Sequence, residues 1–242
     1  MASQPSSVAG PRWPRTLLAA LFLYVVVIGA WMLTGLGGAR TQHYLGLLAD
    51  GPPCLAAVLL AAATARQVAR GALKRAWWCV VGALALYLGG TIIAAAEWLR
   101  ERDPFPGFAD WYFVAFYPAF FAAVLFFIRA RAGRVPWVRL ALDVVILAVG
   151  FGASFWFLVI RPAEARADVE FLKEALSQAY VALNCALVLS LGLLLLTGPE
   201  TPGGRRVPLL LLLGCTTMFL GDIVWVLAKV GGDYLPGGLQ DV

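Results

Sequence analysis

The stretch DPFPGFADWYFVAFYP, residues 103–118, lies between two long apolar runs and determines how they are joined. Pro104 and Pro106 stop a helix, because proline lacks a backbone N–H and disfavours the helical conformation in the residue before it. Asp110 then precedes a second run, where an acidic side chain accepts free backbone N–H groups and faces the positive end of the helix dipole. Trp111 begins a series of aromatic residues, which are typical of the membrane–water interface. The stretch therefore predicts the turn of a hairpin of two membrane helices.

The composition of the whole chain indicates an integral membrane protein. Hydrophobic residues make up 61% of the 242 residues and charged residues only 14%, whereas soluble domains contain about 45–50% apolar and about 25% charged residues. The formal net charge of +5 does not indicate nucleic-acid binding. The basic residues lie in short clusters between apolar runs, as they do in multi-pass membrane proteins.

Seven segments are long and apolar enough for a spanning helix, which needs about 20 residues. They are 16–37, 44–65, 76–98, 110–129, 138–160, 175–197 and 207–230. The second is the weakest, because Asp50, Gly51, Pro52 and Pro53 interrupt it and imply a kink that neighbouring helices cover. Residues 1–15 are polar and rich in proline and serine, so we expect a disordered cytoplasmic tail before a membrane domain over 16–242.

The distribution of basic residues predicts the orientation of the chain. Twelve of the 19 lysines and arginines lie in the N-terminal tail and in the connections 66–75, 129–139 and 205–206, all on one side. The other seven lie on the opposite side, mostly beside acidic residues. The positive-inside rule then places the N-terminus in the cytoplasm and residue 242 outside.

A repeated spacing in the sequence predicts a duplicated hairpin. Three pairs of residues have nearly the same separation: Gly89 and Gly221 by 132, Pro106 and Pro236 by 130, and Asp110 and Asp241 by 131. The alternative is chance similarity between apolar segments. Because the chain ends just after the counterpart of Asp110, the repeat predicts an eighth helix that is missing, and we expect this chain to be the front part of a longer protein.

Asp222 is the strongest candidate for a functional residue. It lies well inside the last segment, in FLGDIVW at 219–225, and an ionisable residue at the centre of a membrane helix costs about 2.5–3.5 kcal/mol on insertion. One interpretation is that it binds a polar ligand, an ion or a proton. The other is a structural hydrogen bond to Asn184, to Tyr180 or to a loosened backbone.

The other polar residues of the apolar segments have interfacial or structural interpretations, and Glu97 also has a functional one. Glu97 either lies at the outer interface or reaches a pocket shared with Asp110. Arg139 and Asp143, four residues apart, predict an ion pair along one helix. Asn184 predicts a hydrogen bond between helices.

Motifs for catalysis and for metal binding are absent from the sequence. The four cysteines, at 54, 79, 185 and 215, do not have metal-ligand spacing, and there is no P-loop, nucleophile elbow or paired-histidine motif. We therefore expect no metal, no cofactor and no enzyme activity in this chain. A retinal protein is disfavoured because the predicted orientation is inverted and Lys229 lies at the membrane edge.

Several motifs together resemble the N-terminal multi-helix membrane sensory modules of bacterial GGDEF and EAL (cyclic di-GMP) signalling proteins and of related sensor histidine kinases. The motifs are LGG 88–90, Glu97, DPFPGFAD 103–110, Phe116-Tyr117-Pro118, RLALDVVILAVG 139–150 and FLGDIVW 219–225. Two positions differ from this pattern. Gly90 stands where an aspartate is usual, and AYVALNC 179–185 replaces a tyrosine–proline pair.

We therefore expect an all-α polytopic bundle in a bacterial cytoplasmic (inner) membrane. The resemblance implies that it senses an extracytoplasmic or membrane-borne stimulus and regulates a cytoplasmic output domain outside this chain, with dimerisation as the expected route. The expected partners are the lipid bilayer and that domain, and not nucleic acid. The sensing candidates are Glu97, Asp110, Trp111, Tyr117 and Asp222. A small transporter or lipid-handling permease and a purely structural membrane subunit are the alternatives.

Overall fold

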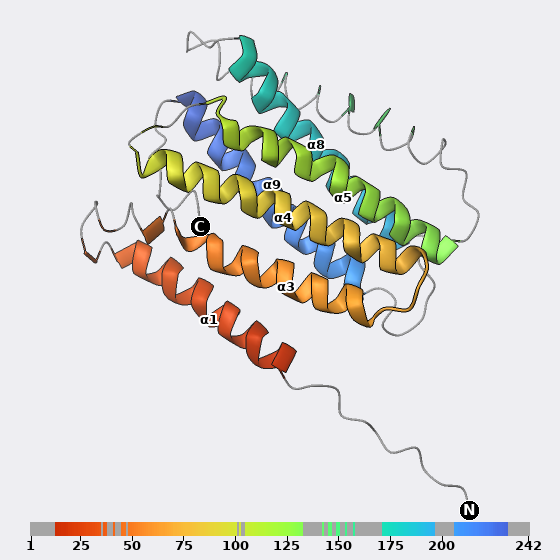
Figure 1. The fold of residues 1–242 in the computed structure, drawn as a ribbon. Helices are drawn as coiled ribbons and strands as arrows, with labels where there is room; N and C mark the ends of the chain where they lie inside the picture. Colours follow the sequence, from red (N-terminus) through yellow and green to blue (C-terminus); the bar gives the residue numbers. More distant parts are fainter. Residues whose placement is uncertain are drawn as a thin grey trace, which may run out of the picture.

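The computed structural model describes the chain as a set of long helices (Figure 1). The described residues are 13–34, 36–37, 41, 45–46, 48–100, 102, 105–132, 142, 145–146, 149–150, 153, 157, 171–196 and 206–231. No strand occurs in these ranges. The helices are α1 (Trp13–Thr34), α3 (Gly51–Gln67), α4 (Ala72–Trp98), α5 (Phe108–Ala132), α8 (Phe171–Leu196) and α9 (Arg206–Gly231).

Four of these helices are long and apolar enough to cross a membrane, which indicates a multi-pass membrane protein. The apolar spans are Ala72–Trp98, Phe108–Ala130, Gln178–Leu195 and Arg206–Val224, and they match four of the seven predicted segments. Helix α1 occupies the first predicted segment. Of the segment 138–160 only isolated residues are described, so that prediction lies outside the described part of the chain.

The segment predicted over 44–65 is interrupted where the sequence indicated: residues 45, 46, 48 and 49 are helical, Asp50 is a turn residue, and helix α3 follows it. Helix α3 begins at Gly51, directly after a turn at Asp50, so that Pro52 and Pro53 lie in its first turn. Proline is compatible with this position because the first N–H groups of a helix have no acceptor within it. The two prolines therefore begin the helix that follows the interruption at Asp50.

The turn predicted from residues 103–118 joins two neighbouring antiparallel helices. Helix α4 ends at Trp98 and α5 begins at Phe108, and these two helices form the largest interface of the described chain. The guanidinium of Arg75, near the start of α4, lies 5.3 Å from the ring centroid of Phe126, near the end of α5. The proposed second copy of the turn, 235–242, is not among the described residues, so the repeat stays a prediction.

Small residues on α4 allow α5 to approach closely. Ala76, Ala83 and Gly90 follow one another at intervals of seven residues, and all three are buried. Residues seven apart lie on the same face of a helix, and small residues at such a face let two membrane helices pack closely in the absence of a hydrophobic driving force. This pattern explains why the α4–α5 interface is the most extensive.

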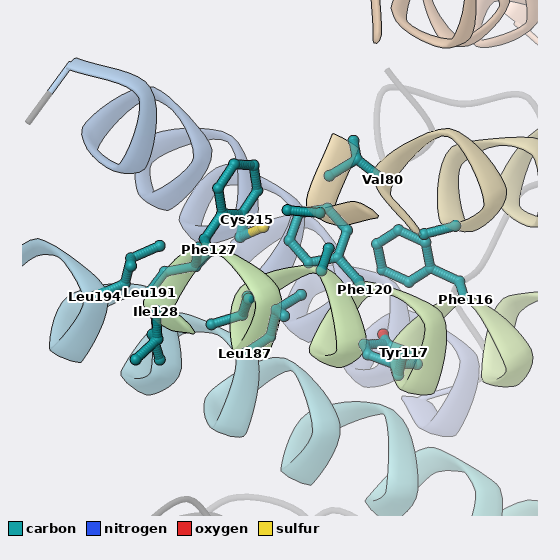
Figure 2. Packing of buried hydrophobic residues seen from close by; sticks show 14 of the residues in the cluster. Val80, Phe116, Tyr117, Phe120, Phe127, Ile128, Leu187, Leu191, Leu194 and Cys215 are labelled. Atoms are coloured by element: carbon teal, nitrogen blue, oxygen red, sulfur yellow. The ribbon is translucent and has the colours of Figure 1, made fainter. Parts of the chain in front are cut away.

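The core lies on both sides of α5. Figure 2 shows Phe116 and Phe120 of α5 pointing toward Val80 of α4. On another side of α5, Leu187 and Leu191 of α8 belong to the same buried cluster. Helix α5 is therefore the central element, and its aromatic sequence fills the space between its neighbours.

Helices α5 and α8 run in the same direction, and α9 runs against them. Asp110 and Tyr117 of α5 bond to Tyr180 and Asn184 of α8 in the same order along the chain. Helix α9 packs against α8, and its Asp222 meets Asn184. The ends of α3, α5 and α8 and the starts of α4 and α9 consequently lie at one end of the bundle (Figure 1).

Candidate functional site

Five polar side chains from three helices meet inside the apolar bundle, and we call them the polar cluster. They are Asp110 and Tyr117 of α5, Tyr180 and Asn184 of α8, and Asp222 of α9. Within α5 the two residues are seven apart and within α8 they are four apart, so each pair lies on one helix face. The parallel arrangement of α5 and α8 then brings the two faces into register.

Asp110 fixes the start of α5 and also joins it to α8. Its Oδ2 accepts a hydrogen bond from the backbone N–H of Gly107 at 2.6 Å, just before the helix begins. Its Oδ1 accepts one from the hydroxyl of Tyr180 at 2.8 Å. Both side chains are buried. The carboxylate therefore stabilises a turn and an interhelical contact at the same time.

Asn184 joins the three helices through its amide nitrogen. Its Nδ2 lies 2.5 Å from Oδ2 of Asp222, 2.7 Å from the hydroxyl of Tyr117 and 3.0 Å from the carbonyl oxygen of Tyr180. A carbonyl oxygen only accepts hydrogen bonds, so the amide atom that faces Tyr180 must be the donor. This contact fixes which end of the side chain is nitrogen.

The amide oxygen of Asn184 has no hydrogen-bond partner in the part of the chain that the structure describes. The residue is 0% exposed, and a buried acceptor without a partner destabilises a structure by about 1–3 kcal/mol. The cluster therefore contains an unused acceptor directly beside an acidic side chain.

Asp222 is held by neutral donors. Besides the amide of Asn184, the hydroxyl of Tyr117 lies 3.5 Å from its Oδ2. No described basic side chain forms an ion pair with it, and α9 contains no acidic residue in its first turn. The hydrogen bond to Asn184 that the sequence suggested is present, whereas the interpretation of Asp222 as a binding residue stays a prediction.

Two of the sensing candidates lie outside the polar cluster. Glu97 is half-buried at the end of α4, and no described side chain bonds to its carboxylate, so the structure does not bring it together with Asp110. Trp111 is 66% exposed in the first turn of α5, where its indole faces away from the bundle. The predicted pair of Arg139 and Asp143 is not among the described residues.

Tyr180 belongs to the cluster although it was not among the sensing candidates. The sequence suggested it only as a partner for Asp222, whereas its hydroxyl bonds to Asp110. Its position four residues before Asn184 is the signal that places both on one face of α8.

Gly90 shows why α4 contributes no acid to the cluster. A Cβ atom at this position would lie 2.7 Å from the ring of Phe113, and that ring packs against Tyr87 with centroids 5.2 Å apart. The space that an aspartate side chain would need is therefore occupied by an aromatic ring. An aspartate at position 90 would collide with this ring unless the ring moved.

The described residues contain no group of three His, Cys, Asp or Glu side chains that could hold a metal ion. Comparison with protein-family models, with curated proteins and with solved structures finds no match to this chain.

Proposed function

We propose that this chain is a membrane signal-input module, and that the polar cluster is the element that changes state. The observation that carries the proposal is the position of Asn184, whose nitrogen joins α5, α8 and α9 while its buried oxygen is unused. Hydrogen bonds between membrane helices contribute on average about 0.6 kcal/mol each. Hydrogen bonds of this strength can break and re-form as the helices move. Because each bond needs particular donor and acceptor positions, the cluster can define two distinct arrangements of the helices.

The signal would act by stabilising one arrangement of the helices over the other. A ligand shifts such an equilibrium only by its difference in affinity for the two states, and a donor for the Asn184 oxygen would favour the arrangement that exposes this oxygen. Movement of α9 relative to α8 would then pass to a cytoplasmic output domain, a diguanylate cyclase, phosphodiesterase or kinase. The resemblance described above supports this choice of output.

The test uses the protein encoded by the complete gene, beginning with the codons that follow residue 242. We expect a GGDEF, EAL or kinase domain there, and we expect Asp222→Asn to change its output by about fivefold or more, as allosteric couplings do. Ser190→Ala is the matched control, because the Ser190 hydroxyl is buried in α8 and, among the described residues, bonds to Ala186 of its own helix and not to another helix. Cyclic nucleotide turnover or autophosphorylation in membranes provides the measurement.

Two outcomes would reject the proposal. The first is a gene that ends at codon 242, because no output domain would then be attached. The second is an output that Asp222→Asn leaves unchanged while the variant inserts and accumulates like the native protein.

A small transporter is the second candidate function, and the absence of a basic partner for Asp222 among the described residues favours it. Transporters use membrane-embedded acids to bind protons and cations. Proteoliposomes that contain a trapped pH dye or a fluorescent phospholipid would reveal proton flux or lipid movement. Flux that Asp222→Asn abolishes supports a transporter, and absence of flux for the native protein removes this candidate.

A further inference from the structure

The connection between α3 and α4 carries four basic side chains, which we call the basic turn: Arg66, Arg70, Lys74 and Arg75. The three arginines are exposed and the lysine is half-buried. The group lies at the end of the bundle where α5 finishes and α9 begins, and those helix ends add exposed arginines at 129 and 206. One end of the bundle is therefore strongly positive.

The stretches that carry the basic turn and the end of α5 contain no acidic residues, and Glu200 is the only acidic residue between Glu174 and Asp222. The sequence contains no aspartate or glutamate between Asp50 and Glu97, none between Asp110 and Asp143, and none between Glu200 and Asp222. None of the four side chains of the basic turn forms an ion pair with a described residue. Arg75 contacts the ring of Phe126, which orients a guanidinium but does not neutralise it. The described residues therefore do not neutralise the four side chains of the basic turn.

Apolar side chains beside the basic turn identify the kind of counter-ion. Leu73 is 41% exposed and Trp78 is 44% exposed, and both lie in the first two turns of α4. Tryptophan and leucine at a helix end are favoured at the boundary between headgroups and acyl chains. A ligand that offers a phosphate to the arginines and an acyl chain to Leu73 and Trp78 fits both features.

We propose that the basic turn binds anionic phospholipids of the leaflet that faces it. Clusters of four to eight basic residues next to a membrane helix attract anionic headgroups, at about 1 kcal/mol for each lysine or arginine. That value corresponds to about fivefold in affinity for each cation removed. This inference is independent of the polar cluster, which lies at the opposite half of the bundle.

The experiment measures lipid association with the full chain in detergent micelles. Brominated phosphatidylglycerol and brominated phosphatidylcholine are added separately, and quenching of tryptophan fluorescence gives the apparent affinity of each. We expect the anionic lipid to bind more tightly than the zwitterionic one. The double variant Arg66→Gln and Arg70→Gln should lose about 25-fold of the affinity for the anionic lipid, whereas the lysine pair at the same positions should retain most of it.

The matched control removes the same number of charges at the other end of the bundle. Arg100 and Arg102 are exposed, and their replacement by glutamine should leave the affinity for the anionic lipid unchanged. The proposal is overturned if both double variants lose affinity equally, if neither does, or if glycerol phosphate binds as tightly as the lipid. The last result would show recognition of a soluble phosphate. Circular dichroism and gel filtration verify that each variant is folded.

Discussion

At the scale of single residues, Asn184 and Gly90 show two ways in which one side chain determines how membrane helices meet. Asn184 supplies a donor where three oxygens from three helices converge. Gly90 has no side chain, so the ring of Phe113 in α5 can lie against the backbone of α4. Lipid tails are as apolar as the side chains, so hydrogen bonds and close packing, and not burial from water, hold such helices together.

We predict that Asn184→Leu lowers the free energy of unfolding by about 1–3 kcal/mol, because it leaves Asp222 without its shortest hydrogen bond. Reversible unfolding in bicelles provides the measurement. A double-mutant cycle with Asp222→Leu should give a coupling energy of about 0.5–1.7 kcal/mol. Strictly additive effects of the two substitutions would show that the contact contributes nothing to stability.

Gly90→Ala should lower the free energy of unfolding by about 1–3 kcal/mol, because overpacking strains a filled interface and the added methyl group meets the ring of Phe113 at 2.7 Å. Gly82 is the control on the same helix, since a Cβ there has no neighbour within 4 Å. Gly82→Ala should be neutral or stabilise by up to about 1 kcal/mol. Adding Phe113→Leu to Gly90→Ala should restore part of the loss, and equal effects at both glycines would contradict the packing explanation.

At the scale of elements, α5 has its two most extensive described interfaces with α4 and α8, and they differ in kind. Its interface with α4 is aromatic against small residues, and its interface with α8 includes the hydrogen bonds of Asp110 and Tyr117. The carboxylate of Asp110 bonds both to the turn before α5 and to α8, so both contacts depend on this one side chain. The start of α5 should therefore respond to changes in either partner.

Asp110→Ala should accelerate hydrogen exchange of the backbone amides at 107–112, because the variant loses the acceptor for both Gly107 and Tyr180. Tyr180→Phe removes only the contact with α8 and should leave exchange at Gly107 close to the native rate. Hydrogen exchange with mass spectrometry separates the two effects. Equal protection in the native chain and in Asp110→Ala would show that this carboxylate does not stabilise the turn.

At the scale of the whole molecule, the described charges divide the bundle into two different ends. The basic turn, the end of α5 and the start of α9 carry exposed arginines at one end. Asp110, Tyr180 and Asp222 lie in the opposite half. The positive-inside rule predicts that the basic end lies in the cytoplasm. On that prediction, the polar cluster lies in the half of the membrane that faces outside.

Ala69→Cys, in the α3–α4 connection, should react with a membrane-impermeant maleimide only after cells are permeabilised. Gly107→Cys, in the α4–α5 turn, should react in intact cells. The native chain, whose four cysteines are buried or half-buried in helices, gives the background labelling. The opposite labelling pattern would reverse the proposed orientation, because basic loops stay in the cytoplasm.

The sequence by itself determined the features that depend on neighbouring residues. The lengths of the apolar runs predicted α4, α5, α8 and α9, and the proline-rich stretch before Asp110 predicted the turn between α4 and α5. Helix formation and membrane insertion depend on local hydrophobicity and on local breakers, so such features can be read directly. The same local reasoning located the interruption at Asp50, although it did not show that Pro52 and Pro53 begin a new helix there, a position that proline tolerates.

Only the tertiary structure decided which helix faces meet. The sequence named Asn184 and Asp222 as candidate partners, but it did not show that Tyr180 bonds to Asp110, 70 residues away, because α5 and α8 pack in parallel. It also showed an unusual glycine at 90 without showing the ring of Phe113 that fills the space. Apolar helix surfaces are similar to one another, so their pairing depends on the shape and hydrogen bonding of residues far apart in the chain, which no local pattern contains.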